Sequence, residues 1–355
     1  MKQWINSLYG TGVKKPLPIL SFPCVSLLGI TVRELISDSE LQAKGMKAVA
    51  DKTDAAAAVS FMDLSVEAEC FGATIRVSDE EVPTVIGRLV GDEDEANALE
   101  VPAVGAARSG LYVESIRKAV QIITDRPVLA GIIGPFSLAA RLLDVTEIMM
   151  DCYDEPDMVH TVLEKATAFL IEYAKAYKAA GADGIMMAEP VSGLLSPALE
   201  EEFSSPYVKQ IVEAVQDDSF IVVYHNCGDN VLRMTDSILS TGADAYHFGN
   251  SIDMADMMVK MPADTVVMGN VDPAGVLRQG TPETVREATL AVMGKCCSYP
   301  NFVISSGCDI PPRTPFSNID AFFSAVESPL TFTAIFSTFS ALTGRSFRPL
   351  SFRRE

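Results

Sequence analysis

The sequence predicts an α/β fold, a closed (βα)8 barrel of the TIM type, and three observations lead to this prediction. Short runs rich in Val, Ile, Met and Ala alternate with longer stretches of helical character, which is the pattern of repeated βα units. The runs are continuously apolar, as expected of parallel strands that are buried on both faces. No glycine-rich nucleotide-binding fingerprint follows the first run, which disfavours an open, doubly wound sheet.

Eight apolar runs are the predicted strands, over residues 18–22, 57–63, 128–134, 184–188, 220–225, 243–248, 265–269 and 302–306. Helices are expected over residues 38–50, 112–123, 158–180, 198–215, 230–240 and 282–293. We assign residues 1–330 to one barrel domain. The charged segment 76–110 is expected to be an excursion over the barrel mouth, and the role of the tail 331–355 stays open.

Composition narrows the class of protein. The chain has 355 residues, of which 48% are hydrophobic, enough for a large core, and its formal net charge of -19 disfavours nucleic acids and anionic membranes as partners. The sequence has no signal-peptide pattern at its start and no apolar run long enough to cross a membrane. Its seven cysteines follow no disulfide spacing, which indicates reduced thiols and a cytoplasmic location.

Soft metal ligands follow two of the predicted strands. Catalytic groups of α/β barrels stand at the carboxyl ends of the strands, where "IVVYHNCGDN" places His225 and Cys227 two residues apart. Strand alternation therefore points these two side chains the same way. Cys308, in "VISSGCDIPP", comes just after the last strand, and closure of the ring is expected to bring it to the same rim.

Two thiolates and one imidazole are the ligand set of a catalytic zinc site, with a fourth position left open to water or substrate. This set disfavours magnesium and calcium, which prefer oxygen ligands. The alternative is a buried structural histidine beside two buried free cysteines, all common core residues. The spacing alone leaves this alternative open.

Other polar residues are weaker candidates. Glu189, at the end of "GIMMAEP", and Asp309, which follows Cys308 directly, are candidate catalytic residues, and Glu189 is also a candidate to orient the substrate or to contact the zinc ion. Asp63 and Asp309 are candidates to fix the tautomer of a ligand imidazole. His247, in "DAYHFGN", is more readily explained as a core histidine than as a fourth ligand or a hydrogen-bond partner of the site.

Several segments together resemble a known family. They are "AGIIGPFSLAARLL", "GADGIMMAEPVSGLLSP", "VVYHNCGDN", "GNSIDM", "VMGNVDPAGVLRQGTPETV" and "SSGCDIPPRTPFSNIDAF". The chain resembles the uroporphyrinogen decarboxylase superfamily over residues 16–326, and within it the corrinoid-dependent methyltransferase branch, which includes methylcobamide:coenzyme M methyltransferases. The resemblance implies a TIM barrel of the uroporphyrinogen decarboxylase type.

The resemblance also implies chemistry. The branch's zinc pattern, His-x-Cys followed far downstream by Cys, corresponds to His225, Cys227 and Cys308. A methyl group would pass between a corrinoid (methylcobamide), carried by a partner corrinoid protein, and a small thiol such as coenzyme M, or from a methylated small molecule to the corrinoid. Residues 17–29 contain no arginine to pair with a porphyrin's carboxylates, which disfavours decarboxylation, and Gly249 stands near the position where some relatives carry an additional glutamate ligand. A non-catalytic zinc or small-molecule binding barrel is the remaining alternative.

Overall fold

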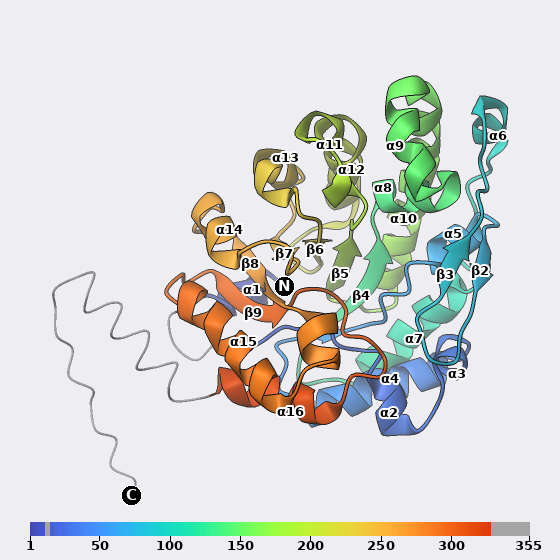
Figure 1. Cartoon of the computed structure of the whole chain (residues 1–355). Coiled ribbons are helices and arrows are strands. Elements are labelled where there is room, and N and C mark those ends of the chain that lie inside the picture. The colour runs from blue at the N-terminus through green and yellow to red at the C-terminus, as the bar shows by residue number, and fades with distance from the viewer. Residues whose placement is uncertain (11–14, 328–355) are drawn as a thin grey trace, which may run out of the picture.

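The chain adopts an α/β fold in a computed structural model that describes residues 1–10 and 15–327, so the tail 331–355 lies outside the described residues. The centre of the fold is one curled sheet of seven parallel strands, whose order follows the chain (Figure 1). These strands are β1 (Ala58–Val59), β4 (Val128–Ile133), β5 (Gly184–Ala188), β6 (Ile221–Asn226), β7 (Ala245–Phe248), β8 (Val266–Val271) and β9 (Phe302–Ser306).

The first of the eight expected strands is absent, and β1 and β9 are the two edges of the sheet. The segment over residues 18–22 that was expected to form this strand follows Pro16 and Leu17, which lie between those edges. The N–H of Leu17 donates to the carbonyl of Ile304 at 3.0 Å, and the carbonyl of Pro16 accepts from the N–H of Ala56 at 2.8 Å. Pro16 and Pro18 have no N–H to donate, so the segment makes isolated bonds in place of a ladder. The expected closed barrel of eight strands is therefore seen as a curled parallel sheet of seven.

Two hydrophobic cores lie on the two faces of the sheet. The inner core fills the space that the sheet curls around, and its side chains alternate along the strands. It includes Leu17, Ile19, Val59, Leu129, Met186, Val223, Ala245, Met268 and Val303. The outer, larger core lies between the sheet and the surrounding helices. The strands are buried along their whole length, which explains their continuous apolar character.

Helices surround the sheet (Figure 1). They are α1 (Lys2–Ser7), α2 (Cys24–Leu28), α3 (Val32–Ile36), α4 (Ser39–Lys52), α5 (Val66–Cys70), α6 (Glu93–Ala98), α7 (Ser109–Ile122), α8 (Pro135–Leu143), α9 (Val145–Asp154), α10 (Pro156–Ala179), α11 (Pro197–Phe203), α12 (Ser205–Val215), α13 (Thr235–Ser240), α14 (Met254–Lys260), α15 (Pro282–Cys296) and α16 (Phe316–Val326). Three short non-α helices, η1 (Ser192–Leu194), η2 (Val231–Arg233) and η3 (Pro273–Arg278), follow strands β5, β6 and β8.

Local sequence explains where the helices begin. The side chain of Asp38 caps α4, and Thr281 forms a capping box with Thr284 at the start of α15. The helix expected over residues 198–215 is two helices that meet at Ser204, and the one expected from residue 230 begins as η2. Asn230 stands at the N-cap position of η2, but its side chain makes no capping hydrogen bond; its amide group donates to the carbonyl of Leu195 at 3.3 Å.

The excursion between β1 and β4 contains an antiparallel hairpin, β2 (Thr74–Arg76) and β3 (Thr84–Ile86), followed by α6. Its tip is held by two ion pairs from other parts of the chain. Arg33 pairs with Asp79 at 2.7 Å, and Arg313, from the segment after β9, pairs with Glu80 at 2.7 Å. These contacts hold the hairpin tip beside the segment that follows Cys308.

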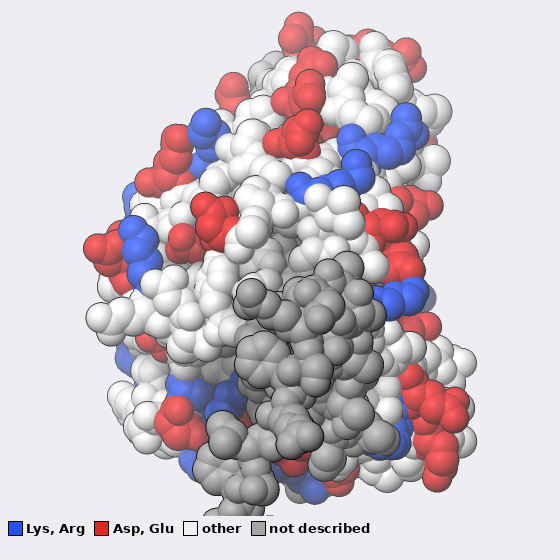
Figure 2. Space-filling model, turned by 90° about the vertical axis from the view of Figure 1, so that its left-hand side faces the viewer, with Lys and Arg blue, Asp and Glu red and all other residues white. Residues whose placement is uncertain are grey.

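On the face that Figure 2 draws, acidic and basic side chains of the described residues are interspersed among uncharged ones. Within the described ranges, none of the helices has both the length and the apolar character that a membrane span requires.

Candidate functional site

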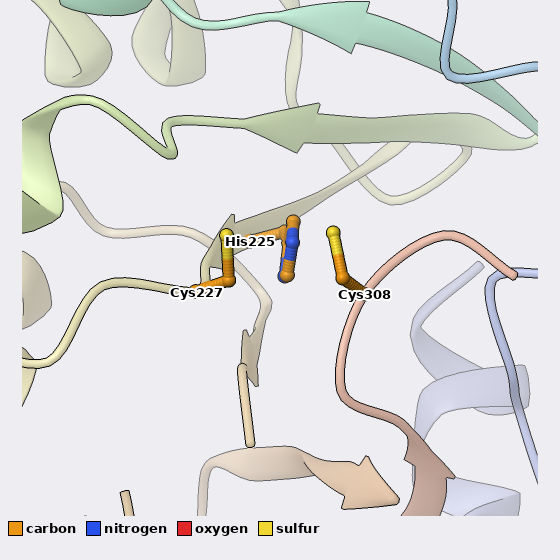
Figure 3. A group of neighbouring side chains, drawn as sticks. All are labelled: His225, Cys227 and Cys308. Atoms are coloured by element: carbon orange, nitrogen blue, oxygen red, sulfur yellow. The ribbon is translucent and has the colours of Figure 1, made fainter. Parts of the chain in front are cut away.

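Three metal-competent side chains converge where the strands end. One ligand atom from each of His225, Cys227 and Cys308 lies within 4.8 Å of the others. Figure 3 shows the imidazole of His225 between the two sulfur atoms, with Cys227 following the same strand and Cys308 entering from a different segment. The expectation that these residues lie close together is therefore confirmed.

Glycines allow the backbone segments to approach at this point. A Cβ atom on Gly249 would lie 2.5 Å from the Cα and Cβ atoms of Cys227, and one on Gly228 would lie 2.3 Å from the Cα atom of Gly193. Gly307, next to Cys308, has the same relation to Asn250, at 2.4 Å from Oδ1. The loops after β5, β6, β7 and β9 can converge only because these positions carry no side chain. A ligand from position 249 is excluded for the same steric reason.

The chemistry of the three side chains fits a soft metal ion such as zinc. His225 is 1% exposed, and its Nε2 atom has no hydrogen-bond partner within the described part of the chain. A buried ring nitrogen without a partner is costly unless something binds it. Two cysteine sulfurs beside this nitrogen supply the donor set of a catalytic zinc site.

The two cysteines behave as a pair that shares a proton. The hydrogen bond from Cys308, with help from nearby His225, lowers the pKa of the Cys227 thiol to about 4. The same bond and burial raise the pKa of the Cys308 thiol well above its usual range. This arrangement favours the thiolate form of Cys227, and binding of a metal ion would have to displace the proton that Cys308 retains.

His247 contacts the first ligand. His225 and His247 are register partners on β6 and β7, and their Nδ1 atoms lie 2.8 Å apart. The Nε2 atom of His247 lies 2.7 Å from the hydroxyl of Ser305 on β9. His247 is fully buried, and burial lowers its pKa well below the usual value. It is thus a core histidine, as expected, and also the hydrogen-bond partner of His225, which was the less favoured expectation.

Glu189 lies outside the ligand group. It is fully buried and accepts hydrogen bonds from the backbone N–H groups of Phe136 and Ser137 and from the Ser137 hydroxyl, at 2.7–2.9 Å. These bonds cap the N-terminus of α8, which begins after Gly134. Burial raises the pKa of Glu189 to about 7. The structure places this carboxyl group behind the site wall, where its neighbours Ala188 and Pro190 line the pocket.

The two aspartates that were expected to fix the ligand tautomer do not contact His225. Asp63 accepts from Arg108, from the hydroxyl of Tyr112 at 2.7 Å and from that of Ser65 at 2.6 Å. Asp309 lines the pocket, and its Oδ1 atom is buried without a hydrogen-bond partner among the described residues. Burial raises the pKa of Asp309 well above its usual value. The side chain that does contact His225 is His247, which the sequence pattern alone did not favour.

The ligands open into a pocket of about 300 Å³. Its walls are mostly apolar, with Arg278, Glu81 and Asp309 as the charged groups, and they include Ile19, Met62, Leu64, Val82, Ala188, Pro190, Pro311 and Pro312. Sequence reasoning missed Arg278, Ser305 and the contribution of the hairpin tip, because none of them belongs to a ligand-spacing pattern. Their position at strand ends or in the charged excursion was the only available signal.

The model of the uroporphyrinogen decarboxylase (URO-D) family matches residues 24–329, most of the chain. The chain belongs to this family. A methylcobamide:CoM methyltransferase MtbA of Methanosarcina mazei is 30% identical over 267 residues, which are 72% of this chain and 75% of that protein. A uroporphyrinogen decarboxylase of Coxiella burnetii is 29% identical over 282 residues, 77% of each chain. Sequence relatives of this URO-D protein therefore include both methyltransferases and decarboxylases.

Solved structures agree on the fold. A methyltransferase from Methanosarcina mazei superposes with a TM-score of 0.77 at 23% identity, covering 88% of this chain and 94% of that one. A B12-independent methionine synthase from Shewanella superposes with a TM-score of 0.56 at 14% identity, covering 93% of this chain and 98% of that one. At these identities the likeness concerns the fold alone.

Proposed function

We propose that this URO-D family protein is a zinc-dependent methyltransferase that moves a methyl group between a corrinoid (methylcobamide) and a small thiol such as coenzyme M. The observation that carries the proposal is the unpartnered Nε2 atom of His225 between the sulfurs of Cys227 and Cys308, at the end of a pocket. The similarity to methylcobamide:CoM methyltransferases supports it.

In this proposal His225, Cys227 and Cys308 hold the zinc ion. Bound zinc supplies a Lewis acid that lowers the pKa of a thiol substrate, so that its thiolate exists at neutral pH. The thiolate takes the methyl group from cobalt, the electron pair of the cobalt–carbon bond stays on cobalt as Co(I), and the thiol proton leaves to solvent. The apolar pocket walls exclude bulk water from the sulfur, which strengthens electrostatic interactions there.

Other residues in and behind the pocket have separate proposed roles in binding and catalysis. Arg278 lines the pocket without an ion-pair or hydrogen-bond partner within the described residues, so it is placed to bind an anionic group of the substrate. Of the two candidate catalytic carboxyl groups, we propose that Asp309, which lines the pocket, contacts the substrate, and that Glu189 acts through the pocket wall that it supports. The corrinoid would be presented by a partner corrinoid protein covering the strand ends.

The proposal also covers the domain organisation, the cellular location and the direction of methyl transfer. We propose that residues 1–330 belong to one domain and that the sheet closes as a (βα)8 barrel, with the segment from Pro16 in place of the predicted first strand; the bonds of Pro16 and Leu17 to both sheet edges support this. The protein acts in the cytoplasm, where its thiols stay reduced. Methyl transfer in the opposite sense, from a methylated donor to Co(I), uses the same ligands and is the second candidate.

Decarboxylation is disfavoured, although decarboxylases are among the relatives. A porphyrin substrate carries many carboxylates, and Arg278 is the single arginine or lysine among the residues that line the described pocket. Residues 17–29, where arginines would be needed, contain none.

The test uses the zinc-loaded full-length protein with free methylcobalamin and a panel of small thiols. We expect loss of the methylcobalamin absorbance, appearance of the Co(I) spectrum and formation of one methyl thioether. A methylated donor with Co(I) runs the second candidate reaction in parallel. Zinc-loaded protein that transfers methyl in neither direction, with free or protein-bound corrinoid, would leave the non-catalytic binding barrel as the better description.

A further inference from the structure

A chain of hydrogen bonds runs from the candidate metal centre across the inside of the sheet. It begins at Nδ1 of His225, passes through both ring nitrogens of His247 and through the hydroxyl of Ser305, and ends at the carbonyl of Leu17. The successive distances are 2.8, 2.7 and 2.6 Å. All four residues are buried. The hydrogen bonds therefore connect these protein groups directly, and no water molecule is needed to link them.

The far end of the chain fixes its direction. A backbone carbonyl can only accept, so the hydroxyl hydrogen of Ser305 is donated to Leu17. The oxygen of Ser305 must then accept from Nε2 of His247. With its hydrogen on Nε2, a neutral His247 presents a lone pair at Nδ1, and this atom accepts the Nδ1 hydrogen of His225.

The His225 end of the chain requires the same direction of hydrogen bonding, for a separate reason. A histidine that binds a metal through Nε2 carries its remaining hydrogen on Nδ1, and this hydrogen needs an acceptor. The carbonyl of His247 is also within reach of Nδ1, but at 3.3 Å, and Nδ1 of His247 at 2.8 Å is the closer acceptor. The register that pairs His225 with His247 on adjacent parallel strands produces this contact.

We infer that His247 is a positioning residue, which through Ser305 and Leu17 fixes the tautomer of His225 and keeps its Nε2 atom free of hydrogen for a metal ion. The common partner of a metal-bound histidine is a carboxylate, a backbone carbonyl or water. Here an uncharged imidazole relay performs this role in a buried place, where an additional carboxylate would be costly to desolvate. The inference rests on the proposed zinc site for its function.

The direct test reads the tautomers by long-range proton–nitrogen NMR on full-length protein labelled with 15N in the histidine rings. The chain has only three histidines, so three sets of signals are expected. We expect His247 to carry its hydrogen on Nε2 both with and without zinc, because Ser305 and Leu17 do not depend on the metal. His247 with its hydrogen on Nδ1 and a bare Nε2 atom would overturn the inference.

Zinc affinity, measured against a competing chelator, gives the second readout. His247→Phe keeps a ring but removes the acceptor, and we expect a loss of roughly 10- to 100-fold, the usual cost of removing such a partner. His247→Asn offers Oδ1 near the place of Nδ1 and should retain most of the affinity. The matched control is His160→Phe, because His160 stacks on Phe203 outside the site. This substitution should leave the zinc affinity unchanged.

The outcomes separate the inference from the proposed function. A folded Phe variant with unchanged zinc affinity, or an Asn variant that loses as much as the Phe variant, would overturn the positioning role. Expected tautomers and affinities in a protein that transfers no methyl group would instead contradict the proposed function and leave the role of His247 standing.

Discussion

At Gly249 the backbone after β7 lies against Cys227, the second proposed metal ligand: a methyl group at this position would stand 2.5 Å from Cα and Cβ of Cys227. Backbone atoms cannot give way as the end of a flexible side chain can. The absence of a side chain at Gly249 is therefore part of what places the Cys227 sulfur beside His225.

We expect Gly249→Ala to destabilise the fold by about 1–3 kcal/mol, the usual cost of overpacking, and to weaken zinc binding by displacing Cys227. Chemical denaturation and chelator competition measure the two effects. Gly294→Ala is the matched control, because a Cβ atom there meets nothing within 4 Å and the residue lies in helix α15. This variant should be more stable by about 0.5–1 kcal/mol. Equal zinc affinity in both variants would show that Gly249 does not position the ligand.

The β2–β3 hairpin is the part of the excursion between β1 and β4 that reaches the candidate site. Its tip is tied by Arg33 and Arg313, and Glu81 and Val82, which follow directly, line the pocket. Both ion pairs are well exposed, and such pairs contribute about 0–1 kcal/mol each. Their effect is therefore expected on local order more than on global stability.

Arg313→Ala should increase amide hydrogen exchange at residues 78–83 while the midpoint of global unfolding stays nearly unchanged. Hydrogen-exchange mass spectrometry resolves the two. Arg117→Ala, which removes an exposed pair within helix α7, serves as control and should leave the hairpin untouched. Unchanged exchange at the tip of the Arg313 variant would mean that the hairpin is held by its other contacts.

The sequence predicted correctly those features that follow from a single physical rule. Buried parallel strands are continuously apolar, and seven of the eight predicted strands are present. The spacing of His225 and Cys227 also fixed their common direction. The prediction of the first strand, over residues 18–22, was wrong because its apolar composition was given more weight than the missing N–H groups of Pro16 and Pro18. The contact between His225 and His247 was only a less favoured expectation, because it depends on the register between two strands, which no local pattern specifies.

The stability of the whole molecule is expected to depend on pH through the buried carboxyl group of Glu67. Glu67, on α5, accepts from the N–H of Ile133 at 3.1 Å, and its other oxygen has no partner among residues that the structure describes. Burial raises its pKa from 4.5 to about 7. The folded state therefore holds this proton more tightly than the unfolded chain does. The associated stability is complete below pH 4.5 and is lost as the pH rises through about 7.

We expect Glu67→Gln to gain stability relative to the unmodified protein as the pH rises from 5 to 8, by on the order of 3 kcal/mol. Denaturant unfolding at several pH values measures this difference. Glu172→Gln, which changes an exposed carboxylate, should follow the unmodified protein at every pH. A difference between the Glu67 variant and the unmodified protein that does not depend on pH would show that Glu67 does not titrate in this range.

The most direct test of the zinc site and its chemistry is X-ray absorption at the zinc edge, recorded on the loaded protein before and after addition of the thiol. We expect two sulfurs at about 2.3 Å and one imidazole nitrogen at about 2.0–2.1 Å, with a light atom in the fourth position. The thiol should replace that atom with a third sulfur. Cys308→Ala, outside the cores, should fold but lose most of its zinc. A first shell without sulfur, or a sulfur count that neither the thiol nor the loss of Cys308 changes, would contradict the account.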